Sequence, residues 1–192
     1  MTEEEKRKLS HWCILLVPAC YIFLLKREML LLLLGAFFLF VAAVEAVRQK
    51  HPALNEKLLK VFDGVYRKEE MYNTSTLIYT LSGMFFSVWL FEKKIALLAI
   101  LFLTFGDGFA ALVGERWGKH KISSRSKKTW EGAAANFTAC LLTGIVFSYF
   151  APVGAVKITA GAIAVTIIEL LPKTKDNIVI PVASGLIMSI IR

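Results

Sequence analysis

The chain has 192 residues, of which 56% are hydrophobic, and its mean hydropathy is +0.59. Its formal net charge of +8 at pH 7 would suggest nucleic acid in a soluble protein. Beside long apolar runs, membrane topology explains the charge first and an anionic ligand second, so we expect no nucleic-acid partner. A spanning helix needs about 20 apolar residues, which leaves room for six or seven spans and excludes a separate soluble domain. We therefore expect one transmembrane domain over residues 1–192.

The N-terminal residues are charged, and no small-residue cleavage site follows the first apolar run, so we expect no cleaved signal peptide. Cys13, Cys20 and Cys140 lie inside apolar runs without the spacing of metal ligands. We expect them to pack in the interior.

Seven apolar segments predict an all-α polytopic membrane protein. In chain order they are Leu9–Leu25, Met29–Val47, Thr74–Phe91, Ile95–Val113, Gly132–Phe150, Ala155–Leu171 and Ile178–Ile191. The last segment is short and contains Pro181, so a broken or partly re-entrant helix is an alternative. Leu54–Tyr66 has apolar residues at helical spacing and charged residues opposite them. It either lies along the membrane surface or forms a solvated linker helix.

Basic residues divide unevenly between the two sides of this arrangement. Seven spans place the N-terminus and the loops near 48–73, 114–131 and 172–177 on one side, with 17 of the 23 lysines and arginines. The positive-inside rule assigns this side to the cytosol. The N-terminus is therefore expected to be cytosolic.

An acid lies inside the fourth predicted span. Asp107 is flanked by Gly106 and Gly108 near the cytosolic end. A charge inside a span costs roughly 2.5–3.5 kcal/mol on insertion scales and marks a functional candidate. Small residues follow on the same helical face, at Ala110, Ala111, Gly114 and Gly118. They allow either tight helix packing or a groove in which the backbone approaches a phosphate.

The next loop is basic and leads into the fifth predicted span. Lys127 and Lys128 precede Thr129, which resembles a helix N-cap, and Glu131 falls in the first turn. Lysines beside a helix N-terminus suit a polyphosphate. An ordinary positive-inside loop is the alternative interpretation.

Further acids lie near the end of the chain. Glu169 is close to the end of the sixth span, and Asp176 and Asn177 immediately precede the seventh. With Asp107, their oxygens could hold Mg²⁺, which favours one or two protein carboxylates together with phosphate oxygens and water. Turn capping by the Asp-Asn pair is the alternative. The motifs of P-loop enzymes and protein kinases are absent from the sequence, which excludes both classes.

Residues 107–132 read DGFAALVGERWGKHKISSRSKKTWEG and resemble the CTP-binding signature of the dolichol kinase and CTP-dependent diacylglycerol and phytol kinase family. That signature is DxxAxxxGxxxG, eight residues, then KKTxEG. Its nine fixed positions are all matched, at Asp107, Ala110, Gly114, Gly118, Lys127, Lys128, Thr129, Glu131 and Gly132. Weaker similarities are RKLxH at Arg7–His11, an acid followed by a hydroxyl at Glu70 and Thr74, and the ending with Glu169, Asp176, Asn177 and Pro181.

The resemblance implies a kinase that transfers the γ-phosphoryl group of CTP to the hydroxyl of a membrane lipid alcohol, either polyprenol-like or dolichol-like, or diacylglycerol-like. It implies that Asp107 and Asp176 are catalytic, and that these two with Glu131 bind Mg²⁺. The implied nucleotide-binding residues are Gly108, Ala110, Ala111, Gly114, Gly118, Lys127, Lys128, Thr129, Glu131, Gly132 and Asn177. The active site is expected to face the cytosol, in the cell membrane or the endoplasmic reticulum membrane.

Two other functions are weighed against this one. Phosphatidate cytidylyltransferases share a similar stretch, but their C-terminal KD…PGHGG…DR run is absent here, which favours the kinase. A non-enzymatic protein that binds anionic lipid would use the lysines without needing Asp107, Glu131 and Asp176 together. The sequence leaves the lipid acceptor and the oligomeric state open.

Overall fold

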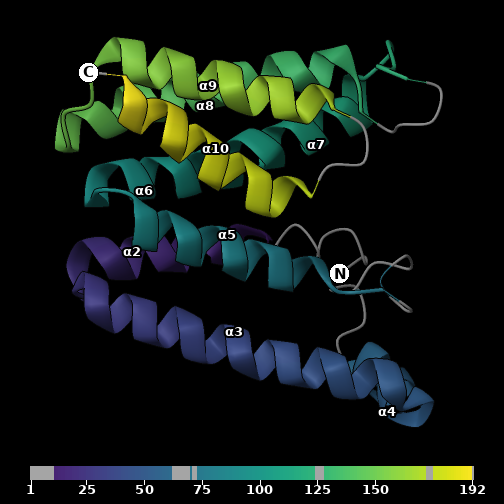
Figure 1. The fold of residues 1–192 in the computed structure, drawn as a ribbon. Coiled ribbons are helices and arrows are strands. Elements are labelled where there is room, and N and C mark those ends of the chain that lie inside the picture. The colour runs from purple at the N-terminus through teal and green to yellow at the C-terminus, as the bar shows by residue number, and fades with distance from the viewer. Residues whose placement is uncertain (1–10, 62–69, 71–72, 124–127, 172–174, 192) are drawn as a thin grey trace.

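The computed structural model describes residues 11–61, 70, 73–123, 128–171 and 175–191 (Figure 1). Within these ranges the chain forms helices and one isolated antiparallel bridge, between Lys121 and Thr129. The all-α class predicted from the sequence is therefore confirmed.

Each of the seven predicted apolar segments contains a helix. In chain order they are η1 (Cys13–Leu15) with α2 (Leu16–Phe23), α3 (Arg27–Lys50), α5 (Thr76–Leu90), α6 (Lys93–Leu101) with η3 (Phe102–Asp107) and α7 (Gly108–Trp117), α8 (Trp130–Phe150), α9 (Ala155–Leu170) and α10 (Asp176–Ile190). Pro181 does not break α10, which is continuous. Among the described residues, three helices have the length and apolar composition to cross a membrane: Arg27–Lys50, Lys93–Trp117 and Trp130–Phe150. The count of seven spans and the cytosolic N-terminus stay predictions.

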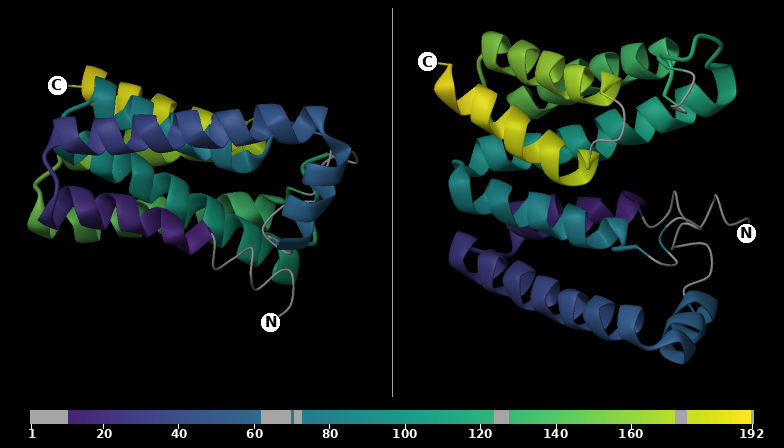
Figure 2. Two further views of the ribbon diagram at one scale, coloured as in Figure 1. Left: turned by 90° about the horizontal axis from the view of Figure 1, so that it is seen from below. Right: turned by 45° about the vertical axis from the view of Figure 1, so that its right-hand side comes forward.

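Helix α4 (Pro52–Val61) covers the first part of the predicted amphipathic segment and has no buried residue. It turns across one end of the bundle (Figure 2). Residues 62–66 of that segment lie outside the described residues. A helix on the membrane surface and a solvated linker are both compatible with this position.

Helix α6 forms the centre of the bundle. Its residues from Ile95 to Ile100 are each at most 4% exposed. A helix that is apolar all round is expected to be surrounded by other elements. Accordingly α2, α5, α8 and α10 all contact α6, with α8, α9 and α10 on one side of it and α2, α3 and α5 on the other (Figure 1).

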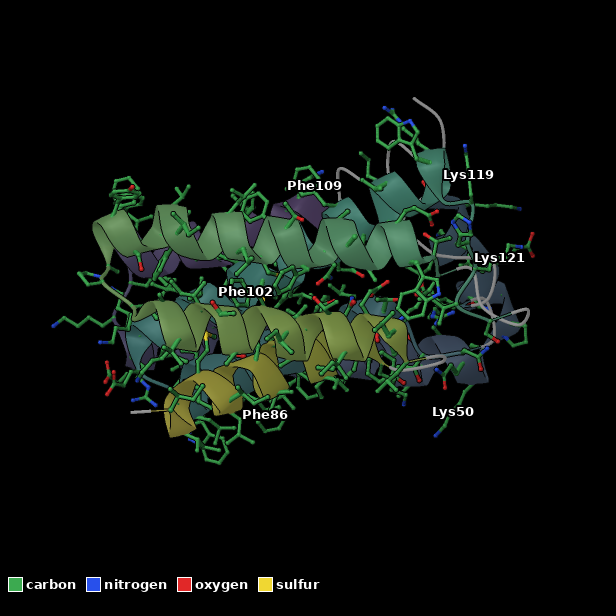
Figure 3. The ribbon with its side chains drawn as sticks, turned by 90° about the horizontal axis from the view of Figure 1, so that it is seen from above. Lys50, Phe86, Phe102, Phe109, Lys119 and Lys121 are labelled. Atoms are coloured by element: carbon green, nitrogen blue, oxygen red, sulfur yellow. The ribbon has the colours of Figure 1, made fainter. Side chains whose placement is uncertain are left out.

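The two ends of the bundle differ in their basic side chains. Lys50, Lys119 and Lys121 all lie at the same end of the bundle (Figure 3). At the other end Arg27 Nε donates to Val88 O at 3.0 Å, and the Lys93 ammonium lies over the Tyr21 ring. The end with Lys119 and Lys121 is also the end at which Asp107 leaves the core.

The three cysteines do not share one environment. Cys140 is fully buried, whereas Cys13 is exposed and Cys20 is intermediate. The expected interior packing is right for Cys140 and wrong for Cys13, because the helix of Cys13 lies at the edge of the bundle.

Candidate active site

Asp107 ends a π-helical segment, η3, inside the continuous helix Lys93–Trp117. In such a segment each N–H bonds one residue further back than in an α-helix, and single π turns are frequent at functional sites. Gly106 lets this segment approach α8 closely, since an added Cβ would lie 2.7 Å from Cys140 Sγ. The local backbone thus fixes Asp107 where the central helix emerges from the apolar core.

Three carboxyl groups from three helices converge at this point. They belong to Asp107, to Glu169 in the last turn of α9, and to Asp176 at the start of α10. One oxygen from each lies within 4.8 Å of the other two. Glu169 is only 7% exposed, whereas Asp107 and Asp176 are partly exposed. Like charges at this separation repel in a partly buried site, and a cation beside the group would offset that repulsion.

The ammonium of Lys128 lies beside two of these carboxylates. Its Nζ is 2.7 Å from Asp176 Oδ2 and 3.6 Å from Glu169 Oε2, and it donates to Leu171 O at 3.2 Å. Glu169 Oε2 is buried and accepts no hydrogen bond from the described residues. Lys127, the other lysine of the signature, lies outside the described residues.

Thr129 caps α8, as the sequence predicts. Its Oγ1 accepts a hydrogen bond from the Gly132 N–H at 3.1 Å. The Thr129 side chain is buried because α7 packs against it. A Cβ added at Gly114 would lie 3.1 Å from Thr129 Oγ1, and a Cβ added at Gly118 would lie 2.6 Å from Thr129 Cγ2. On the α8 side, an added Cβ at Gly132 would lie 2.9 Å from Ala110 O.

The small residues of the signature therefore make a close crossing of α7 and α8. Tight packing, one of the two alternatives for this face, is what the structure shows at Ala110, Gly114, Gly118 and Gly132. Two other predicted nucleotide-binding residues lie outside this crossing. Ala111 is exposed, and Gly108 faces the ring of His11.

Glu131 does not join the three converging carboxylates. Its Oε1 lies 2.7 Å from His120 Nδ1, and its carboxylate also accepts from the His120 N–H. The physical reason is a local hairpin: the Trp130 N–H donates to His120 O at 3.0 Å and so brings residue 120 beside the first turn of α8. The structure thus groups Glu169, rather than Glu131, with Asp107 and Asp176. The signal for Glu169 in the sequence was its position near a helix end, just before the Asp-Asn pair.

Asn177 fixes the start of α10 to α5. Its Nδ2 donates to Thr80 Oγ1 at 2.6 Å. Pro181, one turn later, has no N–H to donate to the Asn177 carbonyl. Gly83 of α5 packs against this carbonyl, since a Cβ added at Gly83 would lie 2.3 Å from Asn177 O. The adjacent Asp176 is held in place by these contacts.

His11 contacts the π-helical segment. Its Nε2 lies 3.0 Å from Thr104 O, and because a carbonyl oxygen only accepts, Nε2 must carry the proton. Nδ1 then faces Asp107 Oδ2 at 4.0 Å. The only sequence signal for His11 was the RKLxH similarity, whose Arg7 lies outside the described residues.

A buried arginine organises the same end of the bundle. Arg48 is 0% exposed and pairs with Glu45, with Nη2 2.7 Å from Oε2. It also donates to Asn55 Oδ1 and to the carbonyls of Glu70 and Asn73. Each of these acceptors compensates the cost of burying a guanidinium.

The contacts of Arg48 hold the segment that begins α5. The Glu70 carboxylate accepts from the Thr76 N–H at 2.9 Å and from the Thr76 hydroxyl. In the acid-then-hydroxyl similarity at Glu70 and Thr74, Glu70 therefore caps the start of α5. The hydroxyl that it contacts belongs to Thr76.

Comparisons with known proteins extend this picture. No family model matches the chain, and no solved structure matches it. A "Probable phytol kinase 2, chloroplastic" of Glycine max is 30% identical over 152 residues, which cover 71% of this chain and 52% of that protein. A "Phytol kinase" of Synechocystis is 37% identical over 127 residues, 60% of this chain and 54% of that protein. A "CTP-dependent diacylglycerol kinase 1" of Saccharomyces cerevisiae is 26% identical over 116 residues, 60% of this chain and 40% of that protein.

The chain spans about half the length of the curated relatives it matches. The resemblance stated from residues 107–132 is confirmed at the level of the family. The chain is homologous to phytol kinases and CTP-dependent diacylglycerol kinases, the CTP-dependent lipid kinase family.

Proposed function

We propose that this protein is a CTP-dependent kinase that transfers the γ-phosphoryl group of CTP to the hydroxyl of a membrane lipid alcohol. The observation that carries the proposal is the convergence of Asp107, Glu169 and Asp176 beside Lys128, at one end of a bundle of apolar helices. The names of the relatives support CTP as the donor and a lipid as the acceptor. The acceptor is a polyprenol-like or dolichol-like alcohol, a shorter isoprenoid alcohol such as phytol, or a diacylglycerol.

The three carboxylates fit a magnesium site. Mg²⁺ prefers oxygen ligands and keeps water and phosphate oxygens as its other ligands. Glu169 Oε2 is a buried oxygen to which none of the described residues donates a hydrogen bond. Asp107 and Asp176 are the principal ligands in this proposal, and Glu169 takes the place first given to Glu131. When bound, the ion would supply charge neutralisation at the transferred phosphoryl group.

The chain's own residues contribute positioning. Lys127 and Lys128 stand before the capped start of α8, where the N–H groups and the helix dipole also favour phosphate. The crossing of α7 and α8 holds this start beside Asp107. Phosphoryl transfer needs positioning and electrostatic stabilisation more than covalent chemistry. Asp107 and Asp176 divide metal binding and activation of the lipid hydroxyl between them.

The topology follows from the charge distribution. We propose seven spans, with the N-terminus and the end that carries Lys119 and Lys121 in the cytosol. The lipid hydroxyl would reach the site at the membrane interface while its chain stays in the bilayer.

Radiolabelled CTP tests the reaction. Protein purified in detergent is incubated with Mg²⁺ and with phytol, dolichol or diacylglycerol in separate reactions. Label from the γ-position in a lipid phosphate is the expected result. Label from the α-position in the lipid, with release of pyrophosphate, would show a cytidylyltransferase. No labelled lipid from either position would mean that the protein binds these ligands without catalysing a reaction.

A pair of double variants tests the nucleotide site. Replacing Lys127 and Lys128 with Ala should raise the apparent KM for CTP strongly, and should lower kcat if one lysine follows the moving phosphoryl group. Replacing Lys119 and Lys121 with Ala removes the same charge from the same loop and should do much less. Equal effects would mean that the loop is a general basic patch.

A further inference from the structure

The ammonium of Lys128 contacts two of the proposed magnesium ligands. Its Nζ contacts Asp176 Oδ2 and Glu169 Oε2, at 2.7 and 3.6 Å. Both carboxylates belong to the group whose oxygens lie within 4.8 Å of one another. The ammonium and a divalent cation would therefore draw on the same oxygens.

The two cations cannot share these oxygens without cost. Lys128 Nζ lies 2.7 Å from Asp176 Oδ2, so a cation held by the same carboxylates would be close to the ammonium. Two positive charges that close together repel strongly in a partly buried site. Glu169 is only 7% exposed, and its Oε2 has no hydrogen-bond donor among the residues that the structure describes. A cation beside this oxygen would offset the cost of burying its charge.

Hydrogen bonds hold the backbone at Lys128, whereas its charge lies at the end of a long side chain. Its carbonyl accepts from the Ile122 N–H at 3.0 Å, and the next residue is the buried cap of α8. Lysine carries its charge on a flexible four-carbon stem. The ammonium can thus leave the carboxylates while the residue stays at the start of α8, where phosphate is favoured.

We propose that Lys128 and a divalent cation bind the carboxylates of Asp107, Glu169 and Asp176 alternately, so that metal binding releases the ammonium to the phosphates of CTP. The inference rests on the proposed function and adds an order to it. Metal binding precedes the contact between Lys128 and the nucleotide. The divalent cation and CTP then each increase the affinity for the other through the Lys128 side chain, which is a coupling between two binding sites.

Binding of Mn²⁺ to the full chain in detergent, without CTP or lipid, tests the competition directly. Lys128→Met should tighten Mn²⁺ binding by roughly tenfold or more, because a competing charge is removed. Lys121→Met removes the same charge from an exposed site in the same loop and should change the affinity by less than about twofold. Lys128→Met should also weaken CTP binding in the presence of metal, whereas Lys121→Met should not.

Lys128→Arg provides a second test should Lys128→Met not fold. A guanidinium holds carboxylates through fixed paired hydrogen bonds, so this variant should bind Mn²⁺ more weakly than the wild-type protein. Unchanged or weaker Mn²⁺ binding in Lys128→Met, unchanged or tighter binding in Lys128→Arg, or no Mn²⁺ binding in the wild-type protein would each overturn the proposal. The Mn²⁺ titrations contain neither CTP nor lipid, so their failure is distinct from a failure of the radiolabel assay.

Discussion

Gly118 offers a test of whether the signature glycines serve helix packing or nucleotide contact. In Gly118→Ala, the new Cβ would lie 2.3 Å from Gly114 O, 2.6 Å from Thr129 Cγ2 and 2.7 Å from Thr129 Oγ1. Ordinary contacts begin at 3.4 Å, so these neighbours would have to withdraw by about 0.7–1.1 Å. Overpacking of this kind costs about 1–3 kcal/mol, and displacing the cap of α8 costs about 1 kcal/mol more.

The resulting loss of about 2–4 kcal/mol corresponds to a fall in Tm of roughly 4–16 °C for a chain of this size. Thermal unfolding in detergent, followed by tryptophan fluorescence, measures it. Gly154→Ala is the matched control, since an added Cβ there meets nothing within 4 Å. If Gly118→Ala kept the wild-type Tm but raised the KM for CTP, Gly118 would make room for the nucleotide and the packing explanation would be refuted.

Three further predictions follow from the contacts of single side chains. Asp107→Asn should abolish phosphoryl transfer with little change in Tm, because Asn keeps the volume but not the charge; a near-normal rate would make Asp107 structural. Arg48→Met should cost about 3–5 kcal/mol of folding free energy, because its acidic partner stays buried without a cation, whereas Lys60→Met, which breaks an exposed pair, should leave the Tm almost unchanged. Thr80→Val removes the hydroxyl that accepts a hydrogen bond from Asn177, at the start of α10. This change should raise the Mg²⁺ concentration needed for half-maximal activity, and an unchanged Mg²⁺ dependence would contradict the positioning role of the contact.

The helical segments were predictable because long apolar runs have few other folds available to them. Local rules also worked at the start of α8, where Thr129 caps the helix as its position before Glu131 suggested. The π-helical segment was not predictable. Most of its residues continue the apolar run of α6, so a change of helical period leaves no clear mark in the pattern.

The choice between Glu131 and Glu169 shows where the sequence stops being informative about the site. Both acids lie near a helix end, and their spacing along the chain does not say which one faces Asp107. Glu131 is held by a residue eleven positions earlier, through a hairpin at the start of α8. Glu169 reaches Asp107 only because α9, α10 and η3 pack together. That contact depends on tertiary packing, which local patterns do not encode.

The lengths of the helices have a consequence for the surrounding lipid. Helices α5, α9 and α10 have 15, 16 and 15 residues, and a 15-residue helix rises only about 23 Å against a hydrocarbon thickness of about 30 Å. In the proposed seven-span arrangement these three helices would be shorter than the bilayer is thick, and the bilayer can adapt by thinning around them, at a cost of a fraction of a kcal/mol per Å of mismatch. Since α9 and α10 carry Glu169 and Asp176 at their ends, thinning would bring lipid headgroups down toward the carboxylates. We therefore expect turnover in reconstituted vesicles to fall as the acyl chains of the host lipid lengthen, while the KM for CTP stays constant.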